Sequence, residues 1–259
     1  MTTKTLGFIG GGRVTRIILE GLNREQQLPV QIVVSDPNPA PLAKLKERFP
    51  QINTAPGDNG KAAGQDMVFL AVHPPATGEA TAQIKGVLRR DAIVVLLAPK
   101  FTLAKLSELL GGFQRIVRVI PNAPSIIGAG YNPMAFAAAI TAADKEIVTA
   151  LFSALGDHLE VAEAKLEGFA LLTGMGPTYL WFQLQTLREL AEGFGLTQAD
   201  VTPALKRMVC GATRTLLESG LPPAEVVDLI PVKPLSEMEA SVTETYRTRL
   251  LALFQKIKP

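Results

Sequence analysis

Cysteine and histidine are scarce in this sequence of 259 residues, which has one cysteine, Cys210, and two histidines, His73 and His158. A single cysteine excludes a disulfide framework within the chain, and no Cys/His cluster is present to ligate zinc. The sequence therefore predicts no metal site. It also fits a reducing compartment, and we expect a cytoplasmic protein.

Charge and long apolar runs are equally sparse. Charged residues make up 19% of the sequence and the net charge is +2, so no strong field attracts nucleic acid or an anionic membrane surface. The longest apolar runs, 92–99 and 134–143, are far shorter than the roughly 20 residues that span a bilayer. The sequence thus favours a small-molecule ligand, with neither nucleic acid nor a membrane as a partner.

What the chain does have is a glycine turn. An apolar stretch over residues 6–9 runs into Gly10, Gly11 and Gly12 and then into a helical pattern that begins near Val14. Glycine allows unusual backbone angles and the close approach of a phosphate, and free N–H groups at the helix start bind it. The pattern predicts a site for a nicotinamide dinucleotide. The alternative is that the glycines only make a turn.

The next predicted strand, 30–35, ends in Ser35 and Asp36. In a dinucleotide fold, an acid at this strand end accepts hydrogen bonds from the adenine ribose and repels a 2′-phosphate. Asp36 therefore favours NADH over NADPH, with Ser35 as a neighbouring cofactor contact. The alternative is a turn residue, because Asp-Pro-Asn-Pro is also typical of turns.

Strands and helices continue to alternate up to residue 161. A buried strand over 66–72 ends in His73, which could hydrogen-bond cofactor or substrate or could be a plain loop residue. A loop rich in proline and glycine follows the strand at 115–119 and carries Asn122, whose amide could serve the nicotinamide end or only the loop. This alternation predicts a doubly wound parallel sheet of the Rossmann type in an α/β protein. Residues 57–64 are expected to be a turn-rich link.

From Glu163 onward only helical patterns are found, so we expect a dinucleotide-binding domain over 1–162 and an all-helical domain over 163–259. The second domain has more apolar helix surface than it can cover, which predicts a homodimer or larger assembly through these helices. A Gly-x-Gly-Pro segment at 174–177 breaks or kinks the helical pattern there and frees N–H groups for an anion.

Four motifs together resemble the pyrroline-5-carboxylate reductase family along nearly the whole chain. They are Phe8-Ile9-Gly10-Gly11-Gly12, Ala71-Val72-His73-Pro74, Arg118-Val119-Ile120-Pro121-Asn122-Ala123-Pro124 and Thr173-Gly174-Met175-Gly176-Pro177-Thr178-Tyr179. The resemblance implies NAD(P)H-dependent reduction of a cyclic imine in proline biosynthesis, by a Rossmann domain with a helical dimerisation domain. The cofactor residues that it implies are Gly10, Gly11, Gly12, Arg13, Val14, Ala71, Val72, His73, Pro74 and Asn122. The substrate residues that it implies are Asn122, Thr173, Gly174, Met175, Gly176 and Pro177.

One segment departs from the family. In place of a glycine-rich Ser-Pro-Gly-Gly-Thr-Thr segment that binds the substrate, this chain has Val232-Lys233-Pro234-Leu235-Ser236-Glu237. Lys233 is then a candidate substrate contact, and the hydroxyls of Ser236 and Thr173 are candidate catalytic donors. Since the glycine pair is lost, we expect weak or absent activity on pyrroline-5-carboxylate itself. The alternatives are a reductase of a carbonyl compound or a deazaflavin, and a dinucleotide-binding dimer without activity.

Overall fold

The computed structural model describes residues 4–259, which divide into two compact units. Unit 1 contains the residues up to Met175 together with Leu253–Pro259, and unit 2 contains Gly176–Ala252. The predicted domains, 1–162 and 163–259, are units of independent folding and function. The division into compact units does not test them, so this boundary stays a prediction.

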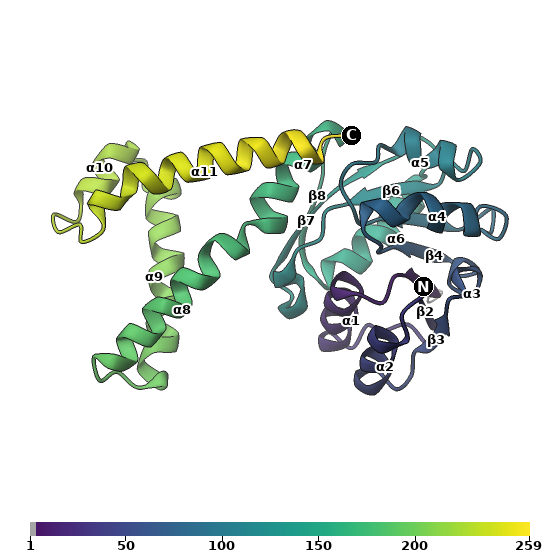
Figure 1. Cartoon of the computed structure of the whole chain (residues 1–259), viewed down its shortest axis with the longest axis horizontal. Helices are drawn as coiled ribbons and strands as arrows, with labels where there is room; N and C mark the ends of the chain where they lie inside the picture. The colour runs from purple at the N-terminus through teal and green to yellow at the C-terminus, as the bar shows by residue number, and fades with distance from the viewer. Residues whose placement is uncertain (1–3) are drawn as a thin grey trace. The chain divides into compact units, whose positions relative to one another are not determined.

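Unit 1 is built on an eight-stranded sheet with the strand order β3-β2-β1-β4-β5-β6-β7-β8 (Figure 1). All neighbouring strands are parallel except β6 and β7, which are antiparallel. The strands are β1 (Leu6–Ile9), β2 (Ile32–Asp36), β3 (Asn53–Pro56), β4 (Met67–Leu70), β5 (Ile93–Leu96), β6 (Ile116–Val119), β7 (Gly130–Phe136) and β8 (Gly156–Glu160).

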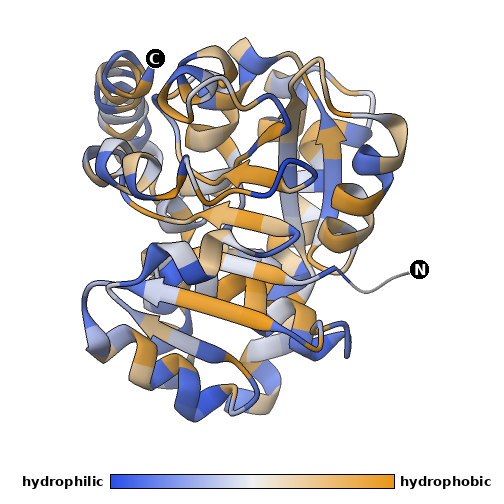
Figure 2. Ribbon diagram, turned by 90° about the vertical axis from the view of Figure 1, so that its right-hand side faces the viewer, coloured by the Kyte–Doolittle hydropathy of each residue, from blue (hydrophilic) through white to orange (hydrophobic). Residues whose placement is uncertain are grey.

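Helices cover both faces of this sheet, and each face has its own core. Phe8 and Phe69 stack at 4.6 Å between ring centroids on the face covered by α1, α2 and α6, whereas Ile9 and Leu70 lie on the face covered by α3, α4 and α5. The central strands are apolar on both faces, as their colour in Figure 2 shows, which is the pattern of a doubly wound sheet. These helices are α1 (Arg13–Arg24), α2 (Pro39–Arg48), α3 (Asn59–Ala63), α4 (Pro74–Ile84), α5 (Leu103–Leu109) and α6 (Ala142–Ser153).

The predicted α/β fold is therefore confirmed, with three differences in detail. Residues 53–56 form β3, just before the expected link at 57–64. Residues 59–63, within that link, form the short helix α3. Neither element is predicted from the sequence. Residues 130–136 form β7, the antiparallel strand, which the sequence analysis did not predict. In both strands a proline, Pro56 or Pro133, weakens the strand pattern because it removes a backbone donor.

Beyond β8 the described residues contain helices and no strand (Figure 1). The short turn at η2 leads into α7, and the helix then widens into a π-helical segment, η3, where the sequence predicts a break or kink. No helix among residues 4–259 is long and apolar enough to cross a membrane. The helical segments are η1 (Ala123–Ile127), η2 (Glu163–Lys165), α7 (Leu166–Phe169), η3 (Ala170–Met175), α8 (Pro177–Gly193), α9 (Gln198–Glu218), α10 (Pro223–Asp228) and α11 (Ser236–Ile257).

Candidate active site

A crevice of about 580 Å³ runs along the carboxyl ends of β2, β1, β4 and β5 in unit 1. Parallel strands of an open α/β sheet bind their ligands at this edge. We call it the crevice. Its lining residues are Gly10, Gly12, Arg13, Val14, Asp36, Pro37, Asn38, Pro41, Ala71, Val72, His73, Pro74, Ala76, Leu97, Ala98 and Pro99.

The glycine turn has the geometry that the sequence predicts. Gly10 has a φ of 106°, and a Cβ there would lie 2.6 Å from the carbonyl oxygen of Ala71, so only glycine fits between β1 and β4. Gly12 has nothing within 4 Å of the place that a Cβ would take, so its surface is open to a ligand. Thr15 stands at the third small-residue place of the motif, where its buried hydroxyl donates to the carbonyl of Gly10 at 2.5 Å.

Two helices begin at the crevice without a capping side chain. Gly12 is the N-cap of α1 and His73 is the N-cap of α4, and neither side chain accepts a hydrogen bond from its helix. The first N–H groups of α1 therefore keep their donors available, and the helix dipole favours an anion there. The start of α4 adds only its dipole, because Pro74 and Pro75 have no N–H and the N–H of Ala76 bonds to the carbonyl of His73. This arrangement suits the pyrophosphate of a dinucleotide.

Asp36 ends β2 and is half-buried at the crevice. Its Oδ2 accepts from the N–H of Gly11 and its Oδ1 accepts from the N–H of Asn38, both at 2.8 Å. Each oxygen keeps a lone pair that can accept from a ribose hydroxyl. The carboxylate thus holds the glycine turn and the start of α2 together while it faces the crevice.

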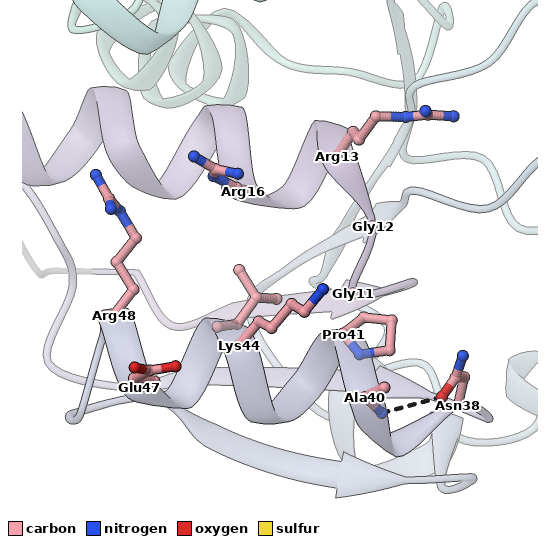
Figure 3. Close-up of a pocket in the computed structure, with 11 residues that line it drawn as sticks. Gly11, Gly12, Arg13, Arg16, Asn38, Ala40, Pro41, Lys44, Glu47 and Arg48 are labelled. Carbon is pink, nitrogen blue, oxygen red and sulfur yellow. Dashed lines mark hydrogen bonds between the residues drawn. The ribbon is translucent and has the colours of Figure 1, made fainter.

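A second cavity, the basic pocket, has a volume of about 750 Å³ and lies between α1 and α2 beside the glycine turn. Figure 3 shows Arg16 on α1, Lys44 and Arg48 on α2, and Arg13 directed away from the space between the helices. Arg16 and Arg48 both pair with the buried carboxylate of Glu20, and their own side chains are more than half exposed. The basic pocket shares Gly12, Arg13, Asn38 and Pro41 with the crevice and is otherwise lined by Gly11, Arg16, Ala40, Lys44, Leu45, Glu47 and Arg48.

Asn122 and Ser35 do not line the crevice. Ser35 is fully buried and its hydroxyl donates to Asn59 Oδ1 at 2.6 Å. Asn122 is 7% exposed; its Nδ2 donates to the carbonyl of Thr173 at 3.1 Å and its Oδ1 accepts from the N–H of Tyr131 at 3.1 Å. The amide therefore joins the loop after β6 to η3, and it fixes the first part of the predicted substrate segment.

The predicted substrate residues fall in both units. Thr173, Gly174 and Met175 belong to η3 in unit 1, where the Thr173 hydroxyl donates to the carbonyl of Phe169 at 3.0 Å. Gly176, Pro177, Lys233 and Ser236 belong to unit 2. Ser236 begins α11 and lines a shallow cavity of about 500 Å³ with Thr243, Arg247 and three other residues of that helix, Glu239, Ala240 and Glu244.

Tyr179, the last residue of the glycine-containing motif, packs edge to face on Tyr246 at 5.7 Å between ring centroids. Burial raises the pKa of the Tyr179 phenol above its usual range, and Tyr246 adds to the shift. The phenol therefore stays protonated at neutral pH, which makes it a donor in this part of unit 2.

Sequence reasoning missed one part of the crevice and one buried ion-pair network outside it. The first is the end of β5, where Leu97, Ala98 and Pro99 line the crevice. The rule that ligands bind at the carboxyl ends of parallel strands, which we applied to β4, would have identified the end of β5 as well. The second is Arg118 on β6, which is 1% exposed and donates to Glu163 at 2.8 Å and to Glu167 at 2.5 Å. No polar pattern in the sequence links these three residues.

No group of three or more His, Cys, Asp and Glu side chains within residues 4–259 is placed to hold a metal ion.

Comparison with known proteins shows the family to which this chain belongs. A family model described as "NADP oxidoreductase coenzyme F420-dependent" matches residues 5–99. Pyrroline-5-carboxylate reductase of Escherichia coli is 30% identical over 228 residues, which cover 88% of this chain and 84% of that protein. The enzyme of the same name from Mycobacterium tuberculosis is 26% identical over an alignment of 259 positions, which covers 96% of this chain and 87% of the relative.

Solved structures agree with this result. A pyrroline-5-carboxylate reductase structure from Coxiella burnetii has a TM-score of 0.70 and 29% identity, and the match covers 99% of this chain and 95% of that one. Plasmodium falciparum pyrroline carboxylate reductase with NADP bound has a TM-score of 0.82, 22% identity and coverage of 100% and 98%, a likeness of fold. With 30% identity over most of both chains, this protein belongs to the pyrroline-5-carboxylate reductase family and is an NAD(P)-dependent oxidoreductase of that type.

Proposed function

We propose that this protein reduces a cyclic imine with NAD(P)H, and that the crevice of unit 1 holds the dinucleotide. The observation that carries the proposal is the open glycine turn at the uncapped start of α1, which receives a pyrophosphate without steric or charge conflict. Bound NAD(P)H supplies the hydride.

The residues of the chain have to bind the dinucleotide and the imine, orient them toward each other and exclude water. The crevice extends from Asp36 at the end of β2 to Pro99 after β5, so the adenosine half lies toward β2 and the nicotinamide half lies toward β4 and β5. A protonated imine already attracts hydride, so positioning supplies most of the acceleration and a hydroxyl donor near the nitrogen is sufficient. Thr173 and Ser236 remain our candidates for that donor.

The choice between NADH and NADPH depends on two opposed features. Asp36 lies at the ribose position and repels a 2′-phosphate, whereas Arg16, Lys44 and Arg48 of the basic pocket attract one. We propose that Asp36 prevails and that NADH binds more tightly. The arginines are more than half exposed and share the Glu20 carboxylate, so solvent screening and pairing weaken their attraction.

We also propose that the protein forms a homodimer or larger assembly through the helices of unit 2. These helices expose large apolar side chains, among them Trp181 at 52%, Phe182 at 67% and Leu217 at 75%. Exposed apolar side chains in such number are typical of an interface between protein chains. A cytoplasmic location fits the single free cysteine, which is exposed.

Steady-state oxidation of NADH and NADPH, measured against a panel of cyclic imines and ketoacids, tests the activity. We expect turnover with a cyclic imine and weak turnover of pyrroline-5-carboxylate, because Pro234 and Leu235 stand where the family has a glycine pair. Turnover of pyrroline-5-carboxylate at about 10 per second, an ordinary enzymatic rate, would contradict the second expectation.

A second candidate function is reduction of a deazaflavin, which the family model matching residues 5–99 favours. Adding an oxidised deazaflavin to the same panel decides between the two acceptors. Tight binding of the dinucleotide with no turnover of any acceptor would indicate a binding protein without activity.

A further inference from the structure

The backbone at Lys100 has an unusual conformation. Its φ is 78°, and Gln26 is the only other non-glycine residue with a positive φ in the part of the chain that the structure describes. Gln26 comes just after α1, where its N–H bonds to the carbonyl of Asn23, and left-handed residues are common at such helix ends. Lys100 follows the strand β5 and ends no helix.

Lys100 occupies a place that normally belongs to glycine. The chain bends at Pro99 and Lys100, a bend that we call the turn, and Lys100 takes the positive φ that glycine usually supplies. A lysine in this conformation is strained because its Cβ crowds the following carbonyl group. Such strain is concentrated at functional sites, which makes the observed outlier a reason to look for a function.

The turn is fixed from both sides. On one side, the N–H of Leu97 bonds to the carbonyl of Leu70 on β4 at 3.2 Å. On the other, the N–H of Leu103 donates to Glu163 Oε1 at 2.6 Å, and the buried Arg118 donates to the same oxygen at 2.8 Å. Strain persists where the surrounding structure determines the backbone in this way. Arg118 and Glu163 therefore hold the segment that carries Lys100.

Lys100 comes directly after the residues that line the β5 end of the crevice, where we propose that hydride transfer occurs. Leu97, Ala98 and Pro99 line the crevice, and Lys100 is the next residue. Its side chain is exposed, and among residues 4–259 no carboxylate pairs with it. A lysine is a compact cation on a flexible stem, which suits the capture of an anion on a small ligand.

We infer that Lys100 binds the carboxylate of an acidic cyclic imine at the β5 end of the crevice. The inference rests on the proposed reductase function and names the group that recognises its substrate. It answers a need that the sequence creates, because Pro234 and Leu235 cannot present the paired bare N–H groups that a carboxylate would use. Arg118 and Glu163 act as positioning residues through the turn.

The test compares cyclic imines of one ring size with and without a carboxylate, reduced by the parent protein and by Lys100→Gly. Glycine accepts a φ of 78° without strain, so this variant keeps the turn while it removes the charged side chain and the strain together. We expect KM for the carboxylated imine to rise about 10- to 100-fold, the usual effect of losing a charged hydrogen bond, with kcat little changed. The imine without the carboxylate and the Kd of NAD(P)H should change less than about twofold, within ordinary context effects.

Three variants serve as controls. Lys100→Arg keeps the charge and should restore most of the affinity. Gln26→Gly relieves the other positive φ, and Lys105→Gln removes a neighbouring lysine that pairs with Glu108; both should behave as the parent. Equal effects of Lys100→Gly on both imines, or no effect on either, would overturn the inference.

Glu163→Ala tests the positioning role. It should raise KM for the carboxylated imine alone, and the double variant with Lys100→Gly should show no further rise, because both changes remove one interaction. If the increases in KM caused by Glu163→Ala and Lys100→Gly are additive, or if Glu163→Ala affects both imines equally, Glu163 contributes to general stability and does not position Lys100.

A binding measurement separates failure of this inference from failure of the proposed function. If the parent protein reduces neither imine, the reductase function is wrong for these rings. Calorimetry with proline and with pyrrolidine, in the presence of NAD+, then decides on Lys100 alone. Weaker binding of proline to Lys100→Gly with pyrrolidine unchanged supports the carboxylate site, and identical binding of proline to both proteins refutes it.

Discussion

The two units of this chain use apolar residues in opposite ways. In unit 1 the strands and their covering helices bury apolar side chains on both faces of the sheet, down to zero exposure at Phe8, Val68 and Phe69. In unit 2 only Val201 is among the buried apolar residues between Gly176 and Ala252, although the helices are rich in leucine and also contain valine. Apolar residues therefore form a buried core in unit 1 and an exposed surface in unit 2.

This difference follows from architecture. A sheet with helices on both faces closes its own core, whereas helices such as α8 and α11 leave apolar faces that a second copy of the chain can cover. Stability should therefore depend most on unit 1 and assembly most on unit 2. Each of the following changes separates the two properties, beginning with the largest expected effect.

Phe69→Ala should destabilise the protein by about 3 to 5 kcal/mol, because it removes a fully buried ring that stacks on Phe8 and leaves a cavity. Denaturant unfolding of unit 1, followed by circular dichroism, measures the loss. Val30→Ala, at a valine that is 91% exposed, is the matched control and should change almost nothing. A loss below about 1 kcal/mol for Phe69→Ala would show that the site collapses freely.

Phe182→Glu should break the assembly while the fold of unit 1 persists. The ring is 67% exposed in one chain, and a charge would be buried without a partner in any apolar interface that covers it. We expect self-association to weaken at least tenfold, or about 1.4 kcal/mol, as measured by sedimentation. Lys206→Glu is the control on the same unit. A parent protein that sediments as a stable monomer of 27.7 kDa would contradict the assembly itself.

Asp36→Ser should shift cofactor preference toward NADPH by about 1 to 3 kcal/mol, the usual value of a charged hydrogen bond, because the carboxylate that repels a 2′-phosphate is lost while the cations of the basic pocket remain. Fluorescence titration with both cofactors measures the shift. Adding Lys44→Gln and Arg48→Gln to this variant should remove much of the gain. Equal affinity of the parent protein for NADH and NADPH would contradict the proposal that Asp36 contacts the adenine ribose.

Ser236→Ala should have the smallest effect, a decrease in imine reduction of less than about tenfold, as expected for one neutral hydrogen bond. Ser241→Ala on the same helix is the control, since its hydroxyl donates to the carbonyl of Met238 within α11. The same rate for Ser236→Ala and the parent would dismiss Ser236 as a catalytic donor.

The sequence predicted the parts of the molecule whose physical requirements are local. The glycine turn needs its backbone angles, and the strand that leads to His73 needs a continuous apolar run, so both are visible in the order of residues. The all-helical pattern after Glu163 is equally direct. These features place the crevice at the ends of β1, β2 and β4.

The remaining features depend on partners that are distant in the chain. Pro133 argues against a strand, yet β7 forms because β6 and β8 pair on its two sides, and the carbonyl of Pro133 still accepts from the N–H of Ile120 at 3.0 Å. Asn122 was predicted as a versatile donor and acceptor, but its contacts with Thr173 and Tyr131 could be known only from the fold. Arg118 and Glu163 are 45 residues apart, so no local pattern joins them.

The uncapped start of α1 would connect the abundance of this protein to the supply of its cofactor. A helix that begins without a capping side chain forgoes stabilisation that a bound anion can provide. A ligand present at 100 times its Kd adds about 2.7 kcal/mol to the folded state by mass action. Chains that lack a dinucleotide would unfold and be degraded more often than loaded ones. The amount of enzyme in a cell would therefore follow the concentration of dinucleotide as well as the rate of synthesis.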